Sequence, residues 1–335
     1  CLIIGAGMAG LLAAHTLTTA GWQVTVLDKG RGVGGRMANR RLNEAGTARA
    51  DHGAQFFTVR SDRFRHWVDD WLAAGVAAEW TRGFGTHDGH PRYRGVPGMT
   101  AIAKQLAQAL AELGASVQTG VRVTAVQMSQ TPRPHWQAIT ADQQTIIADA
   151  LLLTPPVEQT LALLTAGQVP LPPDAQQALA QVQYDPCFAV LAELDSPSQI
   201  PAPGGVQVQG ELISWIADNQ QKGVSAVPTV TIHASPAFTR AHYEDDFTAV
   251  ADQLLRAAEE AGWLRVAQVK TVQVQRWRYA QPRDLYPERC LVLGAEQGLP
   301  LVAFAGDAFA EARVEGAALS GLAAAAALLK AQKGA

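Results

Sequence analysis

A glycine-rich turn near the start of the chain constrains the fold more than any other feature of the sequence. The apolar run 1–4 leads directly into Gly5-Ala6-Gly7-Met8-Ala9-Gly10, and residues 11–20 then have the pattern of a helix that ends at Gly21. A second apolar run, 23–27, ends at Asp28. The order strand, glycine turn, helix, strand, acid predicts a Rossmann βαβ unit, which binds a dinucleotide.

Each position of this turn has a physical role in the predicted site. Gly5 allows the tight turn, Gly7 lets a diphosphate approach the backbone, and Gly10 lets the helix lie close to the sheet. The helix N-terminus directs unpaired N–H groups at the phosphates. Asp28 is placed to accept a hydrogen bond from a ribose 2′-hydroxyl and would repel a 2′-phosphate, which disfavours NADP in this slot. An ordinary glycine loop would explain the glycines but not Asp28.

A basic and glycine-rich segment, residues 29–37, follows the second predicted strand. It contains an R-x-x-G-G-R pattern that ends at Gly35 and Arg36. Glycine amides and an arginine cation both favour a diphosphate. The alternative is a basic loop that continues to Arg40 and Arg41 and binds nucleic acid. A net charge of −3 and the lack of further basic clusters in the sequence disfavour nucleic acid as a partner.

At this position the pattern resembles the second motif of the FAD-dependent amine oxidase and desaturase superfamily, which includes the renalases. The resemblance implies that the dinucleotide is FAD and that Arg36 lies beside its phosphates. Residues 51–58, Asp-His-Gly-Ala-Gln-Phe-Phe-Thr, are similar to a segment that passes the isoalloxazine ring in renalase-like flavoproteins. There Gln55 would offer a polar contact, and Phe56 or Phe57 would wall the ring. The alternative is a buried turn with both phenylalanines in the core.

The C-terminal segment supports the FAD prediction, because residues 301–305 form a strand pattern that ends in Gly306-Asp307. The resemblance places Asp307 at the ribityl or phosphate region and the Val314 amide near flavin O2, where a helix N-terminus stabilises negative charge. Val123, or alternatively Val121, would offer its backbone to the adenine. The full predicted cofactor set is Gly5, Ala6, Gly7, Met8, Ala9, Gly10, Asp28, Lys29, Gly35, Arg36, Met37, Gln55, Phe56, Val123, Thr154, Gly306, Asp307 and Val314.

The patterns predict an α/β (α+β) protein of two domains. A Rossmann-like FAD-binding domain is expected over residues 1–60, 96–156 and 281–335. A mainly antiparallel-sheet substrate domain is expected over residues 61–95 and 157–280, as in the amine oxidase and p-hydroxybenzoate hydroxylase-like flavoproteins. Helices are expected over 61–74, 100–113 and 242–262, and strands of the substrate domain over 187–194, 212–217, 229–234 and 269–279.

Parts of the middle region resemble bacterial renalases more than amine oxidases. They are residues 184–187, 214–219 with Lys222, 233–236 and 276–280. Trp215 and Trp277 are also typical of core residues, and Lys222 is expected to be a solvated loop cation. The substrate contacts implied by the resemblance are Gln55, Phe57, Trp215, Asn219, His233, Trp277 and Tyr279.

The renalase resemblance implies an oxidase of dihydronicotinamide dinucleotides. The substrates would be 2- or 6-dihydro-β-NAD(P), oxidised to β-NAD(P)+ while O2 is reduced to H2O2, in a metabolite-repair role. Such a substrate needs no proton removed before its hydride leaves, and no catalytic triad or carboxylate pair is evident in the sequence. The alternatives are an FAD-dependent amine oxidase, whose flavin-facing lysine finds no match, a desaturase or protoporphyrinogen-type oxidase, and a flavin-binding protein without turnover.

Cysteine usage and apolar patterning set the remaining expectations. The chain contains Cys1, Cys187 and Cys290, widely spaced, so we expect no disulfide, no metal site and a cytoplasmic location. No flavinylation motif is evident, so FAD is expected to bind non-covalently. The apolar stretch 316–329 is expected to be too short and too weakly hydrophobic to span a bilayer, and to form a helix packed on the sheet instead. Because the chain begins inside a strand pattern without Met, a few residues are expected to precede it.

Overall fold

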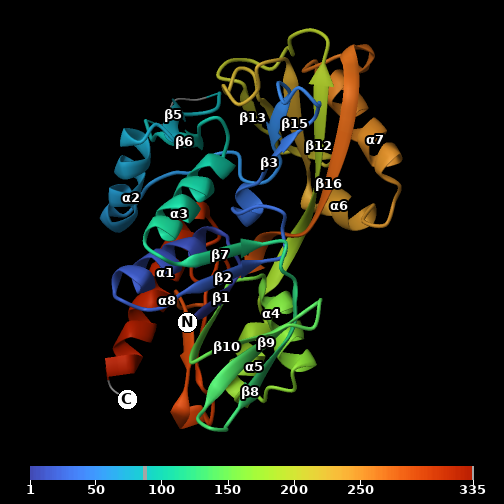
Figure 1. The fold of residues 1–335 in the computed structure, drawn as a ribbon. Coiled ribbons are helices and arrows are strands. Elements are labelled where there is room, and N and C mark those ends of the chain that lie inside the picture. Colours follow the sequence, from blue (N-terminus) through green and yellow to red (C-terminus); the bar gives the residue numbers. More distant parts are fainter. Residues whose placement is uncertain (86–88, 334–335) are drawn as a thin grey trace.

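A computed structural model describes residues 1–85 and 89–333, and its centre is a six-stranded sheet. The strands are parallel except β17, which runs antiparallel to β18. β1 lies in the interior of this sheet between β11 and β2, and β18 lies on the far side of β11, so the two ends of the chain supply strands to one sheet (Figure 1). In sheet order the strands are β17 (Leu291–Leu293), β18 (Leu301–Phe304), β11 (Ala150–Leu153), β1 (Leu2–Ile4), β2 (Thr25–Asp28) and β7 (Ser116–Thr119).

Helices α1 (Met8–Thr19), α3 (Thr100–Glu112) and α8 (Val314–Lys333) lie together on one side of this sheet (Figure 1). Ile3 belongs to the core on the helical side, whereas Leu2 and Ile4 belong to the core on the other face, as the alternation of a strand requires. The second face is covered by β8 (Val123–Ser129), β9 (His135–Thr140), β10 (Thr145–Ala148), α4 (Val157–Ala166) and α5 (Pro173–Ala180). The predicted strand–turn–helix–strand unit is confirmed.

The last helix, α8, corrects the expectation that its apolar stretch is too short and too weakly hydrophobic for a membrane. Residues Val314–Gln332 have a mean hydropathy of 1.4 and are long enough to cross a bilayer by length and composition alone. More than half of this window is buried inside the protein. A Cβ on Gly321 would lie 2.1 Å from the Ala9 carbonyl oxygen, so α8 packs directly on α1 through its glycine. This contact is typical of a core helix.

A second, antiparallel sheet forms the other half of the protein. Its order is β13 (Gly205–Gln207), β14 (Ile213–Asp218), β15 (Thr229–Ala234), β12 (Gln183–Leu194) and β16 (Val269–Asp284). Helix α7 (Phe247–Glu260) covers one face and shares a hydrophobic core with β12, β14 and β15. The mixed α/β architecture with an antiparallel substrate-side sheet is therefore confirmed.

The prediction of a helix over 242–262 is wrong in its first turn, because residues 242–246 are not helical and only α7 (Phe247–Glu260) falls within that range. Helix α6 (Pro236–Ala241) ends before His242, and α7 begins after Asp246. The Asp246 carboxylate accepts hydrogen bonds from the amides of Thr248 and Ala249, which makes Asp246 the N-cap of a new helix. A capping aspartate within the periodic pattern was the signal for this break.

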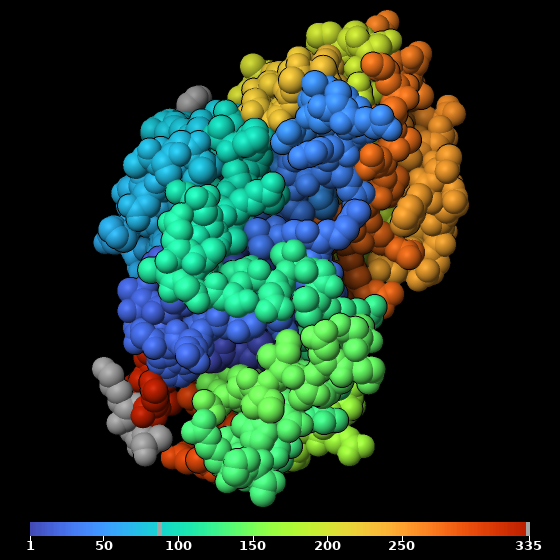
Figure 2. All heavy atoms as spheres, in the orientation of Figure 1, coloured from blue at the N-terminus to red at the C-terminus, as the bar shows by residue number. Residues whose placement is uncertain are grey.

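Residues 61–85 and 89–95 and the hairpin of β3 (Asn39–Arg41) and β4 (Arg49–Asp51) lie where the two halves meet (Figure 2). Helix α2 (Asp62–Ala73) buries Phe64, Val68 and Trp71 in the same core as α1, although the sequence assigns this segment to the substrate domain. The following hairpin, β5 (Ala77–Thr81) with β6 (Arg92–Gly95), carries Trp80, which donates to the Pro203 carbonyl of the other half. The segment therefore contacts both halves, and the domain limits stay a prediction.

Candidate functional site

The glycine turn between β1 and α1 is held by backbone contacts that only glycine allows. Gly5 has φ +108°, and a Cβ there would lie 2.4 Å from Thr154 Oγ1 at the end of β11. A Cβ on Gly10 would lie 2.0 Å from the Gly5 carbonyl oxygen. A Cβ on Gly7, in contrast, would meet no atom within 4 Å. The turn is therefore closed behind Gly5 and Gly10 and open in front of Gly7, as expected for a backbone surface that receives a diphosphate.

The two ends of the chain meet beside this turn. Gly306 follows β18, and a Cβ there would lie 3.7 Å from the Thr154 carbonyl oxygen. A Cβ on Gly35 would lie 3.7 Å from Gly7 Cα, which places the second glycine segment beside the first. Arg36 of that segment forms an ion pair with Asp307 at 2.5 Å. These residues gather at the carboxyl ends of β1, β11 and β18, where α/β sheets bind their ligands.

The arrangement fits the diphosphate of FAD. Gly7 is the N-cap of α1 and makes no side-chain cap, so the first amides of the helix have no side chain in front of them. Arg36 supplies a cation at the same place and also donates to the Tyr279 carbonyl oxygen at 3.2 Å. Met8 and Ala9 lie in the first turn of α1, Met37 in the short 3₁₀ helix Gly35–Met37, and Val314 is the first residue of α8.

Asp28 at the end of β2 holds the turn in place. Its carboxylate oxygens accept hydrogen bonds from the amides of Ala6 and Gly30, both at 2.7 Å. Each oxygen keeps a further lone pair, so a ribose contact remains a prediction. The Val121 amide donates to the Asp28 carbonyl oxygen, and Val123 begins β8 nearby in sequence. The predicted cofactor residue Lys29 donates to the Gln159 side chain at 2.9 Å.

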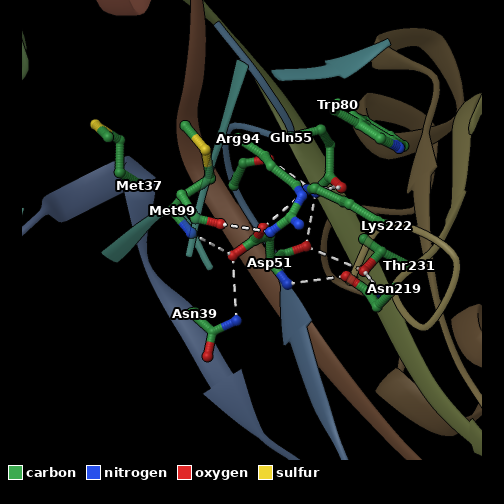
Figure 3. A network of polar contacts seen from close by, with 12 residues as sticks. Met37, Asn39, Asp51, Gln55, Trp80, Arg94, Met99, Asn219, Lys222 and Thr231 are labelled. Carbon is green, nitrogen blue, oxygen red and sulfur yellow. Dashed lines mark hydrogen bonds and ion pairs between the residues drawn. The ribbon is translucent and has the colours of Figure 1, made fainter. Parts of the chain in front are cut away.

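A buried ion pair that the sequence did not predict lies between the two halves. Lys222 Nζ lies 2.8 Å from Asp51 Oδ2, and both side chains are fully buried (Figure 3). The ammonium also lies 5.0 Å from the centre of the Trp80 ring. The expectation that Lys222 is a solvated loop cation is therefore wrong. The Asp218 carboxylate accepts from the amides of Gln220 and Gln221, and this tight turn after β14 precedes the inward-pointing lysine.

Asp51 connects this lysine to both halves of the protein. Its second carboxylate oxygen accepts from the Met99 amide at 2.9 Å and from Asn39 Nδ2 at 3.1 Å (Figure 3). Its backbone carbonyl accepts from the Thr231 hydroxyl on β15. Asn219, a predicted substrate contact, is also fully buried and uses its amide in this network: it accepts from the Asp51 amide and donates to Thr231.

Gln55, His233, His52 and Trp277 form the next layer of the site. Gln55 Nε2 lies 3.5 Å from His233 Nε2, so the structure brings two predicted substrate contacts together. The Trp277 indole N–H donates to the His52 carbonyl at 2.8 Å, and the two rings stack with centroids 5.2 Å apart. His52 was not among the predicted contacts, although it stands inside the segment that was identified.

Both histidines of this layer are uncharged at neutral pH. Burial, together with the smaller effects of Arg40 and His233, lowers the pKa of His52 to about 3. Burial also lowers the pKa of His233 to about 4, and the Lys222 ammonium acts in the same direction. Burial also lowers the pKa of Lys222, while the charge of Asp51 and the hydrogen bond to it act in the opposite direction.

The predicted aromatic contacts fall into separate groups of packed rings. Phe56 packs against Trp80, Phe84 and Trp215, with centroids 5.2 to 6.3 Å apart, so two predicted contacts share one cluster. Phe57 packs in the core instead, and its partners are Phe64, Trp71 and Tyr93. The structure therefore supports the core interpretation for Phe57. Tyr279 packs edge-on against Tyr184, on the side where Arg36 and Asp307 lie.

No group of three or more His, Cys, Asp or Glu residues that could hold a metal ion occurs within residues 1–85 and 89–333. The cysteines Cys1, Cys187 and Cys290 are free. The site is thus made of glycine backbone, arginines, neutral histidines and aromatic rings. Such a set can bind a dinucleotide and orient a flat ring, and its redox chemistry must come from a bound cofactor.

Family comparison agrees with this description. Residues 74–329 match the family described as flavin containing amine oxidoreductase, and residues 3–71 match an NAD(P)-binding Rossmann-like domain. The first match covers well over half of the chain and includes Thr154, Lys222 and Asp307. The second covers the glycine turn and the segment around Asp51.

Solved structures share the fold over nearly the whole chain. A putative protoporphyrinogen oxidase from Exiguobacterium sp. 255-15 aligns with a TM-score of 0.70 and 14% identity over 98% of each chain. A CLA-producing fatty acid isomerase from P. acnes aligns with a TM-score of 0.67 and 15% identity over 96% of this chain and 97% of that one. An oxidoreductase from Methanosarcina mazei aligns with a TM-score of 0.63 and 15% identity over 96% of this chain and 98% of that one. At these identities the likeness supports the fold alone.

Proposed function

Because the chain belongs to the flavin-containing amine oxidoreductase family and is an FAD-dependent oxidoreductase, we propose that it oxidises isomeric dihydro forms of NAD(P). The substrates carry the extra hydride at position 2 or 6 of the nicotinamide, and the product is β-NAD(P)+. One dihydronicotinamide, one O2 and one proton give one oxidised nicotinamide and one H2O2. FAD, when bound, supplies the redox chemistry by accepting the hydride and passing both electrons to O2.

The observation that carries this proposal is a pair of arginines beside the site, Arg40 and Arg31, neither of which has a carboxylate partner among the described residues. Arg40 on β3 donates to Gln275 at 2.6 Å and lies close enough to His52 to lower its pKa. Burial and the neighbouring Arg31 lower the pKa of Arg40 itself. Within the described part of the chain neither arginine pairs with an acid. The phosphates of a dinucleotide substrate would be attracted here, whereas the cation of an amine would be repelled.

The chain's own residues have the roles of binding and orientation in this proposal. The α1 amides and Arg36 would hold the FAD diphosphate, and the Val314 amide would face the flavin. The neutral rings of His52 and His233 provide hydrogen-bonding groups, and their lowered pKa values make them weak bases. A dihydronicotinamide needs no base, because its ring nitrogen lone pair drives hydride release once carbon and acceptor are held at about 3–3.5 Å. Non-covalent FAD, a cytoplasmic location and a role in metabolite repair belong to the same proposal.

The test is anaerobic stopped-flow reduction of the FAD-loaded protein by a panel of donors. We expect 2- or 6-dihydro-NAD to bleach the flavin absorbance rapidly and ordinary 4-dihydro-NADH to do so at least about 100-fold more slowly, a difference of about 2.7 kcal/mol in barrier. Equal rates with 4-dihydro-NADH would contradict the proposal. Primary amines and polyamines belong in the panel, because the family's description makes amine oxidation the second candidate. Rapid bleaching by an amine would replace the first proposal with the second.

A further inference from the structure

The carboxamide of Gln55 is held in one orientation. Its Oε1 accepts from Lys222 Nζ at 3.3 Å, and its Nε2 donates to the backbone carbonyls of Asp51 at 2.6 Å and Gly53 at 3.1 Å. The reverse orientation would place an NH2 group against the ammonium and an oxygen against two carbonyl oxygens. Both contacts would be repulsive, so the hydrogen-bond network itself assigns the amide.

His233 lies on the nitrogen side of this amide, beside Gln55 Nε2. The two N–H groups of Gln55 Nε2 are directed at the Asp51 and Gly53 carbonyls, and the amide nitrogen has no lone pair that accepts. A proton on the His233 nitrogen 3.5 Å away would find no acceptor in Gln55, so a lone pair is favoured at that nitrogen. The His52 backbone lies close enough to the His233 ring to affect its pKa, and the His52 carbonyl accepts the Trp277 indole N–H. A neutral imidazole that accepts at Nε2 carries its proton at Nδ1.

The position of Lys222 leaves it no alternative partner. The side chain is fully buried, its ammonium lies between Asp51 Oδ2 and Gln55 Oε1, and the Trp80 ring lies alongside (Figure 3). Asp51 cannot turn away, because its other carboxylate oxygen is held by the Met99 amide and by Asn39. Arg94 is another nearby cation, and repulsion between the two positive charges lowers the pKa of Lys222.

We propose that Lys222 is a positioning residue: together with Asp51 it orients the Gln55 carboxamide, and Gln55 in turn fixes His233 as the tautomer protonated at Nδ1. This proposal deepens the proposed function and rests on it in one respect, since Gln55 and His233 are taken as groups that the substrate meets. The Lys222 ammonium thereby sets which atoms of Gln55 and His233 donate and accept hydrogen bonds, without contacting the substrate itself.

The test measures the tautomer of His233 by long-range proton–nitrogen NMR on the FAD-loaded protein at pH 7, with His233→Gln used for assignment. The wild type should show the proton on Nδ1 alone. Because Lys222→Met leaves a buried carboxylate and is expected to fold poorly, the working variant is Lys222→Met/Asp51→Asn, which removes both charges. In this variant the amide loses the donor to its oxygen, and both tautomers should appear. Lys270→Met, which removes a half-exposed lysine paired with Glu193, is the matched control and should leave the spectrum unchanged.

A second readout is the dissociation constant of the product, β-NAD+, from flavin difference spectra. It should rise about 10-fold in the double variant and stay unchanged in Lys270→Met. A wild-type proton on Nε2, or a folded double variant whose His233 spectrum and NAD+ affinity match the wild type, would overturn the positioning role. Because the tautomer is read without substrate, this outcome is separate from the donor panel: a flavin that no dihydronicotinamide reduces would overturn the proposed function and leave the NMR result standing.

Discussion

The glycine turn before α1 and the Asp51–Lys222 network both lie where segments far apart in the chain meet, but different atoms hold them in place. The turn depends on backbone atoms: Gly10 sits against the Gly5 carbonyl, and Gly5 sits against Thr154. The network depends on two opposite charges that are fully buried, surrounded by hydrogen bonds from Asn39, Met99 and Gln55. A close backbone contact is disrupted when a side-chain atom is added, whereas a buried ion pair is disrupted when one charged group is removed.

This difference also separates binding from orientation. The turn offers open space in front of Gly7 and a cation at Arg36, which are the requirements of a diphosphate. The network offers no free group of its own and instead sets how Gln55 and His233 are presented. We therefore expect damage to the turn to abolish FAD binding, and damage to the network to weaken stability and substrate binding while FAD remains.

The largest effect is expected from a methyl group added to the closed side of the turn. Gly10→Ala places a Cβ about 2.0 Å from the Gly5 carbonyl oxygen, so it should cost more than about 4 kcal/mol and abolish FAD binding. Gly7→Ala is the matched control, because its Cβ meets no atom within 4 Å and its φ of −82° suits alanine. It should leave the apoprotein within about 0.5 kcal/mol of wild type but weaken FAD at least about 10-fold. Thermal unfolding of the apoproteins and FAD titration measure both; equal stability of the two variants would break the comparison.

Removing one charge of the buried pair should have the next largest effect. Lys222→Met leaves the Asp51 carboxylate buried without its cation and should lower the free energy of unfolding by about 3–5 kcal/mol. Adding Asp51→Asn should recover most of that loss, because no uncompensated charge then remains. Urea unfolding of the wild type, both single variants and the double variant gives the coupling energy. Additive losses in this cycle would show that the pair does not act as a unit.

The neutral histidines should make the free energy of unfolding depend on pH, with an effect smaller than that of breaking the buried pair. In the folded protein the pKa of His52 is about 3 and that of His233 about 4, against about 6.5 in an unfolded chain. The unfolded state therefore binds more protons below pH 6.5, and stability is lost as pH falls through that range. Between pH 7 and pH 5 each histidine should cost about 2 kcal/mol. His233→Gln should show a shallower loss than the wild type in urea unfolding at the two pH values; parallel curves would mean that His233 is not held neutral.

The smallest effect is expected at the edge of the site. Arg40→Gln removes a cation that has no acidic partner among the described residues, so the fold should change by less than about 0.5 kcal/mol. If the substrate carries phosphates, its KM should rise about 10-fold with little change in kcat. Arg256→Gln, on the exposed face of α7, is the control and should change neither constant. An unchanged KM in Arg40→Gln would remove the electrostatic support for a dinucleotide substrate.

The two regions also differ in how far the sequence could predict them. Gly5, Gly7, Gly10 and Asp28 lie within one βαβ unit, so their spacing is visible along the chain, and the sheet strands follow from short apolar runs. Lys222 and Asp51 are 171 residues apart, and the turn that directs the lysine inward depends on the Asp218 carboxylate. A lysine between Gln221 and Gly223 has the local pattern of an exposed loop, so only its tertiary partners reveal its burial. Phe57 was ambiguous for the same reason, since its neighbours Phe64, Trp71 and Tyr93 come from other elements.

The most direct test of the central claim is the cofactor content of the purified protein and of its Gly7→Ala variant. We predict one FAD per wild-type chain, visible as a flavin absorbance spectrum and released into solution when the protein is precipitated with acid. The Gly7→Ala variant should fold and retain less FAD than the wild type at equal protein concentration, because its affinity for FAD is at least about 10-fold weaker. A colourless wild-type protein that does not take up added FAD would contradict the account, and so would a Gly7→Ala variant that retains FAD with wild-type affinity.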